Sequence, residues 1–287
     1  MFWLSLALAE LPPEALTALR RGDCGSALGA LEGVEGLEAE VARSRCGAPS
    51  RLDEHLGDGG VIEGYARLLV AREAVESKPA QAEEVLAGLT LPGEAGLEVR
   101  LLRARARINQ DKSLEAREDL RALLSTSVAA EARYWLAYGA ETRGDTDPAV
   151  VTYRACWAKA ISPWDQRAAE RLEGLGHPVP DFSSVEARAL ALERARTLVK
   201  QHKAPEAIPL YDGITEATGE EGSAWTHEVA FALFKAKDYE RSMEWMGRLE
   251  PTSGSQRGGA DTLFHYALGT SRTGDYEAAA AYYTRLF

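Results

Sequence analysis

Apolar residues recur along the chain at the spacing of an α-helix. Leu97, Leu101, Ala104 and Ile108 occupy positions i, i+4, i+7 and i+11, which lie on one face of a helix. Runs of β-branched residues are nearly absent, and alanine, leucine, arginine and glutamate are abundant, a mixture with high intrinsic helix propensity. The pattern therefore predicts an all-α protein.

The clearest internal repeat lies near the C-terminal end. The tripeptide Asp-Tyr-Glu occurs at 238–240 and again at 275–277, and the register continues, so that Trp245 corresponds to Tyr282. Each copy predicts a first helix ending at a Gly-Asp or Lys-Asp turn, followed by a second helix that carries a small residue near its start. This unit is similar to the tetratricopeptide repeat, whose period is about 34 residues.

The small residue of the second helix also recurs further upstream. It is found at Ala27, Ala82, Ala116, Ala149, Ala207, Ser242 and Ala279. The gaps between these positions are 55, 34, 33, 58, 35 and 37 residues, and the two long gaps predict an extra helix or a degenerate unit. We expect a solenoid, or superhelix, of antiparallel helical hairpins.

Prolines and glycines divide this predicted array. The segment with Pro178 and Pro180 predicts a joint at 177–185, between an N-terminal helical-repeat region at 10–176 and C-terminal tetratricopeptide-like repeats at 186–287. Solenoids normally end in a polar capping helix. Because the sequence shows none, we expect either that the chain is a fragment truncated at 287 or that another domain follows it.

The N-terminal residues 1–9 read Met-Phe-Trp-Leu-Ser-Leu-Ala-Leu-Ala. An apolar stretch that closes on a small-x-small pair is typical of the end of a secretory signal peptide, although no basic segment precedes it. Two interpretations stay open. The segment is either the remnant of a signal peptide or the apolar first turn of a helix.

Three cysteines bear on the cellular compartment. Cys24 and Cys46 are 22 residues apart, a separation that a helical hairpin can bring together, whereas Cys156 lies far away in an amphipathic segment. In an oxidising compartment we expect a Cys24–Cys46 disulfide with Cys156 as a buried thiol. The alternative is three reduced, packed cysteines.

Charge and hydropathy exclude some partners. The formal net charge is −11, which disfavours binding to nucleic-acid phosphates or to anionic membranes. No run of about twenty apolar residues occurs, so no membrane span is predicted. With 45% hydrophobic residues, the chain can build a core without metals.

Motifs of catalysis and cofactor binding are missing from the sequence. It contains no His-Glu-x-x-His, no P-loop, no Gly-x-Ser-x-Gly and no Gly-x-Gly-x-x-Gly. We therefore predict no catalytic residue, no metal ligand and no cofactor.

Two groups of residues are candidates for ligand binding. Arg100, Arg103 and Arg107 lie on neighbouring turns of one predicted helix and form either an anion-binding strip or a solvated face balanced by nearby acids.

The second group is aromatic. Tyr134 and Tyr138 are spaced i, i+4, and so are Tyr153 and Trp157. Such rings can stack on sugars, or they can fill the grooves between stacked hairpins.

One stretch carries a family resemblance. In residues 149–175, Tyr153 is followed four positions later by Trp157, then by a proline turn and a helix with apolar Ala168 and Leu172. This resembles the N-terminal superhelical domain of soluble lytic transglycosylases, periplasmic enzymes that act on peptidoglycan. The resemblance implies a helical scaffold that holds glycan strands for a C-terminal lysozyme-like domain, whose catalytic glutamate lies in a Glu-Ser dipeptide. The dipeptide Glu76-Ser77 ends a predicted repeat helix before Pro79, and the catalytic role is not carried over to it.

Three functions follow as hypotheses. The first is the non-catalytic scaffold of a periplasmic lytic transglycosylase, which positions peptidoglycan for a catalytic domain in cis. The second is a stand-alone tetratricopeptide adaptor that binds a protein or peptide in the cell envelope. The third is a cytoplasmic adaptor of the same fold.

Overall fold

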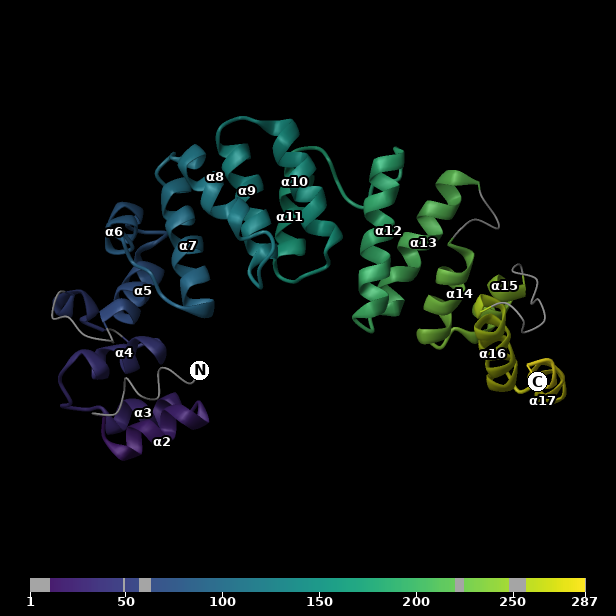
Figure 1. Cartoon of the computed structure of the whole chain (residues 1–287), viewed down its shortest axis with the longest axis horizontal. Helices are drawn as coiled ribbons and strands as arrows, with labels where there is room; N and C mark the ends of the chain where they lie inside the picture. The colour runs from purple at the N-terminus through teal and green to yellow at the C-terminus, as the bar shows by residue number, and fades with distance from the viewer. Residues whose placement is uncertain (1–10, 49, 57–62, 220–224, 248–256, 287) are drawn as a thin grey trace. The chain divides into compact units, whose positions relative to one another are not determined.

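The computed structural model describes residues 11–48, 50–56, 63–219, 225–247 and 257–286 (Figure 1). Throughout these residues, every regular element is a helix, which confirms the predicted all-α class. The signal-like segment at 1–9 lies outside the described residues.

The chain divides into two compact units, residues 1–149 and 150–287. The division falls inside α10 (Thr146–Ala158). The joint predicted at 177–185 lies within the second unit, between two helices, and stays a prediction.

Antiparallel helical hairpins build the first unit. Its helices are α2 (Pro13–Arg21), α3 (Cys24–Ala30), α4 (Leu37–Arg45), the short 3-10 helix η1 (Leu52–His55), α5 (Glu63–Ala74), α6 (Pro79–Val85), α7 (Gly93–Ile108), α8 (Ser113–Ala122) and α9 (Ala129–Thr142). The pairs α2/α3, α5/α6 and α7/α8 are hairpins, and each hairpin from α5 onward packs on the next.

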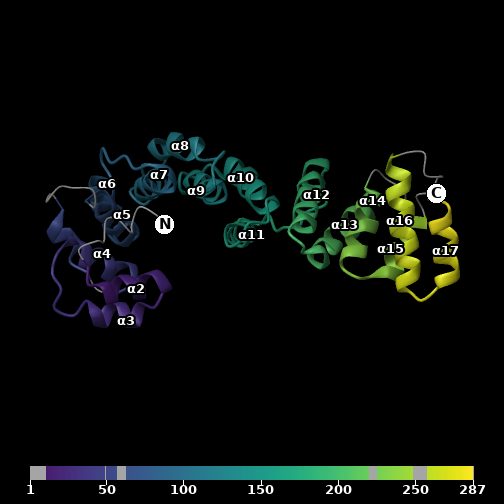
Figure 2. The same cartoon turned by 60° about the horizontal axis from the view of Figure 1, so that its bottom comes forward.

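Hairpins also build the second unit. After α10 it contains α11 (Trp164–Gly174), α12 (Val185–Lys200), α13 (Ala204–Thr218), α14 (Thr226–Lys235), α15 (Tyr239–Gly247), α16 (Arg257–Arg272) and α17 (Tyr276–Thr284). The pairs α12/α13, α14/α15 and α16/α17 are hairpins, and in Figure 2 the last two lie side by side.

The two long gaps in the repeat, for which the sequence predicts an extra helix or a degenerate unit, both contain additional helical elements. Between Ala27 and Ala82 the chain forms α4 and η1 before the next hairpin begins at α5. Between Ala149 and Ala207 it forms α11. Among the described residues, the repeat spacing is therefore interrupted by α4 and η1 in the first gap and by α11 in the second.

The small residue of every second helix is buried. Six of the seven positions are alanines, each at most 3% exposed, and the seventh, Ser242, is 1% exposed. At Ser242 the hydroxyl donates a hydrogen bond to the carbonyl of Ala230, 2.8 Å away on the first helix. A side chain of this size lets two helices of a hairpin approach closely, as the repeat pattern predicts.

Of the six hairpins named above, all except α5/α6 share one backbone conformation at the turn, and the turn between α9 and α10 has it as well. The residue that ends the first helix adopts a positive φ, and the next residue donates its N–H to a carbonyl five positions earlier, as in a Schellman turn. The residues with positive φ are Gly22, Asp111, Gly144, His202, Lys237 and Gly274. Only three are glycines, so this turn is fixed by the packing of its helices as well as by glycine.

Turn position 237 offers a test of that statement. A left-handed backbone strains lysine but not glycine, so Lys237→Gly should stabilise the second unit by about 0.5 to 1 kcal/mol. Gly274 occupies the corresponding turn position of the last hairpin, so replacing this glycine by alanine (Gly274→Ala) should destabilise the second unit by about 1 kcal/mol. Urea unfolding of both variants measures the two effects, and an equal sign for both would contradict the shared turn.

Close helix approach at the small positions predicts a second result. Ala82 of α6 is fully buried and its neighbour Ala80 is exposed. Ala82→Leu should therefore destabilise the first unit by about 1 to 3 kcal/mol through overpacking, whereas Ala80→Leu should change its stability by less than about 0.5 kcal/mol. Denaturant unfolding compares the pair, and similar effects at both positions would rule out the packing role of Ala82.

Candidate binding site

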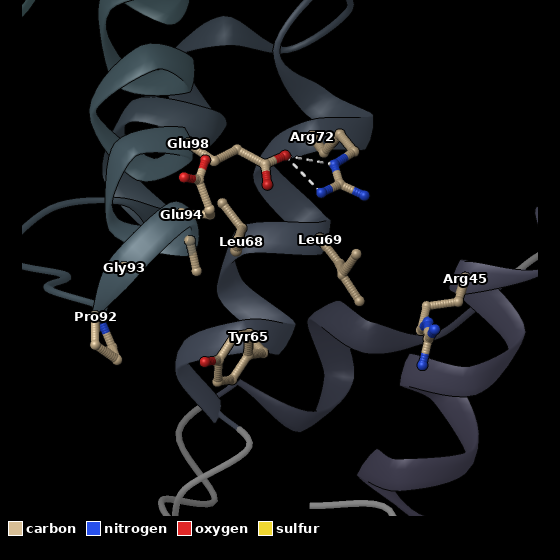
Figure 3. Close-up of a pocket in the computed structure, with 10 residues that line it drawn as sticks. Arg45, Tyr65, Leu68, Leu69, Arg72, Pro92, Gly93, Glu94 and Glu98 are labelled. Atoms are coloured by element: carbon tan, nitrogen blue, oxygen red, sulfur yellow. Dashed lines mark hydrogen bonds and ion pairs between the residues drawn. The ribbon is translucent and has the colours of Figure 1, made fainter. Parts of the chain in front are cut away.

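A hollow of about 380 Å³ opens between α4, α5 and α7 of the first unit. It lies on the face formed by the first helices of successive hairpins, called here the first-helix face, where α5 packs on α7 and α7 packs on α9. Its lining residues come from these three helices and from Pro92, which precedes α7, and are Arg45, Tyr65, Leu68, Leu69, Arg72, Pro92, Gly93, Glu94, Ala95 and Glu98 (Figure 3).

Helix α5 supplies the floor. Tyr65, Leu68, Leu69 and Arg72 follow i, i+3, i+4 and i+7, so they share one face of the helix. Leu68 and Leu69 are 4% and 9% exposed and belong to the cores on either side of α5. The two leucine side chains make the floor apolar. Because both belong to packed cores, the floor is also held in place.

The start of α7 supplies the opposite wall. Pro92 precedes the helix, and Ala95 is partly buried against the core that includes Leu68. Glu98 follows one turn later and accepts two hydrogen bonds from Arg72, at 2.8 Å from Nε and 2.5 Å from Nη2. This ion pair joins α5 to α7 across the hollow and neutralises both charges at its upper edge.

The remaining charges at the rim are separated. Glu94, on the α7 side, accepts a hydrogen bond from the Ser127 hydroxyl at 2.7 Å. Arg45, at the end of α4, is exposed and, within the described part of the chain, forms no ion pair. The rim is consequently positive beside α4 and negative beside the start of α7.

The backbone that carries Arg45 is anchored by its neighbours. Cys46, the next residue, forms a disulfide with Cys24 of the first hairpin, with their Cα atoms 5.3 Å apart. Arg43 donates hydrogen bonds from Nη2 to the carbonyls of Leu31 and Val34, at 2.8 and 2.5 Å. The end of α4 is thus held to α3 and to the turn that follows it.

The predicted arginine strip lies on α7, away from the hollow. Arg103 forms a bidentate pair with Asp119 of α8, at 3.0 and 2.8 Å. Arg107 binds Glu83 of α6 at 2.9 Å and Asp119 at 3.2 Å. Arg100 is exposed and makes no ion pair among the described residues. Carboxylates already occupy the donors of Arg103 and Arg107, as the interpretation of a solvated, acid-balanced face expects.

Glu83 is the hub of this charge cluster. Burial raises its pKa, but the hydrogen bonds from Lys112, Arg107 and Gln110 outweigh burial and lower the pKa from 4.5 to about 2. The donor atoms lie 2.9 to 3.0 Å from the carboxylate oxygens. The cluster ties α6 to α7 and to the turn before α8, so its role is structural.

The first aromatic pair is partly exposed on α9. The rings of Tyr134 and Tyr138 are nearly parallel, with centroids 6.4 Å apart and an interplanar angle of 5°. The Trp135 ring lies edge-on to both tyrosine rings. The guanidinium carbon of Arg105 lies over the Trp135 ring, 4.8 Å from its centroid. Both tyrosines also pack against the core between α7 and α9.

The second aromatic pair is buried in the second unit. Tyr153 is 0% exposed and Trp157 is 6% exposed. Arg194 lies over the Trp157 ring at 4.9 Å and pairs with the buried Asp165 at 2.9 Å. Both rings therefore serve packing between helices and present no open ring face to a sugar.

Other kinds of site are not found in the described residues. No group of three or more His, Cys, Asp or Glu side chains there is arranged to hold a metal ion. Nor does a helix among those residues have the length and hydropathy needed to cross a membrane.

The hollow was not predicted from the sequence. The stripe from Tyr65 to Arg72 has the same spacing as any core-facing stripe, and only its mixture of phenol, leucine and guanidinium distinguishes it. Arg45 joins the site through the fold of α4, which no repeat pattern covers. The signal that could have directed attention here is the 55-residue gap that contains α4.

The low pKa of Glu83 generates a prediction. Its folded-state value lies below its ordinary 4.5, so its stabilising effect is present above pH 4.5 and is lost as the pH falls toward 2. Glu83→Gln should lower the unfolding free energy of the first unit by about 1 to 3 kcal/mol at pH 7, and the deficit should shrink toward pH 2. The exposed Glu118→Gln on α8 is the matched control, and a deficit independent of pH would contradict the assignment.

Comparisons with known proteins add little to these observations. No protein-family model matches the chain, and no curated protein matches it. Among solved structures, the tetratricopeptide repeat (TPR) domain of P58(IPK) is similar over 95% of this chain and 90% of that chain, with 15% identity and a TM-score of 0.29. An overlap this weak supports no conclusion about the site, which rests on its own residues.

Proposed function

We propose that this protein binds a protein or peptide partner on the first-helix face of its first unit. The observation that carries the proposal is the hollow between α4, α5 and α7. Its volume of about 380 Å³ lies in the range of ligand-binding pockets, and it is large enough to take one bulky apolar side chain.

The physical properties of the hollow favour a peptide side chain as its occupant. The floor of Leu68 and Leu69 is apolar, and filling it removes apolar surface from water, at about 25 cal/mol per Å². The floor is packed from below, so binding requires little ordering of the protein itself. Exposed polar groups around the rim can then orient the partner, as in other grooves that take an anchoring side chain.

A glycan scaffold in the periplasm is the second candidate. The Cys24–Cys46 disulfide supports an oxidising compartment, and we propose an extracytoplasmic location on that ground, with the cytoplasm as the alternative. The partly exposed, parallel Tyr134 and Tyr138 support a sugar-stacking surface. The buried Tyr153 and Trp157 do not contribute to one.

A peptide selection tests the proposal. A random peptide library is displayed and selected against the whole chain, against Ala95→Trp and against Leu114→Trp. Ala95 is partly buried at the hollow, so a tryptophan there should fill it, whereas Leu114 is 66% exposed on α8 and serves as the matched control. We expect peptides enriched on the native chain to lose at least about tenfold in affinity for Ala95→Trp, which corresponds to about 1.4 kcal/mol, and to keep their affinity for Leu114→Trp.

Two outcomes would contradict the proposal. One is equal binding of the enriched peptides to both tryptophan variants, with thermal unfolding showing that both are folded. The other is binding of purified peptidoglycan strands, lost when Tyr134 and Tyr138 are both replaced by alanine, with no enriched peptide, which would favour the glycan scaffold.

A further inference from the structure

The charges around the hollow restrict the chemistry of its partner. We infer that the hollow recognises an apolar side chain that lies next to a single acidic residue, whose carboxylate binds Arg45. This inference rests on the proposed function, because it names the partner class of the same site.

The first step concerns which rim charges are available. Arg72 is occupied by Glu98, with both donors on one carboxylate oxygen. Arg45, the other arginine of the lining, is exposed to solvent and forms no ion pair with any described residue. An arginine presents several N–H donors in a planar fork, which suits bidentate binding of a carboxylate.

The second step concerns position. Arg45 comes from α4 and the leucine floor comes from α5, and these two helices pack on each other. Figure 3 shows Arg45 beside the floor on the side of Leu69, whereas Glu94 and Glu98 come from α7 on the other side. A residue adjacent to the buried apolar side chain is therefore the one that meets the guanidinium.

The third step concerns rigidity. The arginine side chain is long, but its backbone is fixed by the disulfide at Cys46 and by the hydrogen bonds of Arg43 to Leu31 and Val34. A fixed attachment point lowers the entropy lost when the ion pair forms. The position of the Arg45 backbone is consequently more restricted than that of an arginine on an unsupported loop would be.

The fourth step limits the number of acids to one. The chain carries a net charge of −11, and the carboxylate of Glu94 lines the α7 side of the same hollow. A run of acids would therefore be repelled by Glu94 and by the net negative charge of the chain. A single acid beside Arg45 lies closer to the guanidinium than the Debye length of about 8 to 10 Å, so salt screens their attraction only in part. The partner is thus an apolar residue with one acidic neighbour, and not an acidic tail.

A charge-exchange experiment on the whole chain tests the inference. Each peptide enriched on the native chain is made in three forms, with its acidic residue kept, replaced by the matching amide, or replaced by lysine. Affinities are measured for the native chain, for Arg45→Glu and for Arg121→Glu. Arg121 is exposed on α8, so its reversal changes the net charge equally but leaves the hollow untouched.

On the native chain the amide form should bind about three- to fivefold more weakly than the acidic form, as expected for a partly exposed ion pair. Arg45→Glu should abolish or invert this preference and favour the lysine form, whereas Arg121→Glu should preserve it. An absence of acidic preference, or equal effects of the two reversals, would overturn the inference. If the peptides remain sensitive to Ala95→Trp in that case, the proposed function survives, and if they are insensitive, both fail.

Discussion

Close approach between the two helices of each hairpin is the constraint on which the rest of the structure depends. It is possible because the second helix places a small, buried residue at the contact, from Ala27 to Ala279. Where the residue is Ser242, its hydroxyl bonds a carbonyl of the facing helix, so the polar group is satisfied without separating the helices. The same left-handed turn closes the hairpins at Gly22 and at Lys237, although only one of these residues is glycine.

The candidate site arises where the regular hairpins are interrupted. Helix α4 stands between two hairpins, and its end is fastened by a disulfide and by Arg43, which places Arg45 beside α5. Further along, the first helices are joined by ion pairs such as Arg72–Glu98, which leave the leucine floor open between them. The interruption of the repeat therefore creates a surface that is confined to one place. In a uniform array of hairpins, every surface would instead recur along the whole length of the array.

The sequence predicted the repeat because hairpin packing imposes a local rule, a small residue at a fixed place, that can be read without knowledge of distant contacts. The same logic indicated, through the long gaps, where an extra helix or a degenerate unit interrupts the repeat, and the structure has helices at both places. It could not predict the turn at Asp111, because its left-handed backbone is imposed by helix packing and not by a glycine. It also could not predict the hollow or the partners of Arg107, because these depend on which side chains meet across helices 12 or more residues apart.

Backbone hydrogen exchange, measured by mass spectrometry with and without a peptide selected on the native chain, tests the central claim most directly. If the first-helix face is the binding surface, the peptide should slow exchange at the end of α4, in α5 and at the start of α7, and leave α6 and α8 unchanged. Protection confined to the second helices α6 and α8, or to the second unit, would contradict the account.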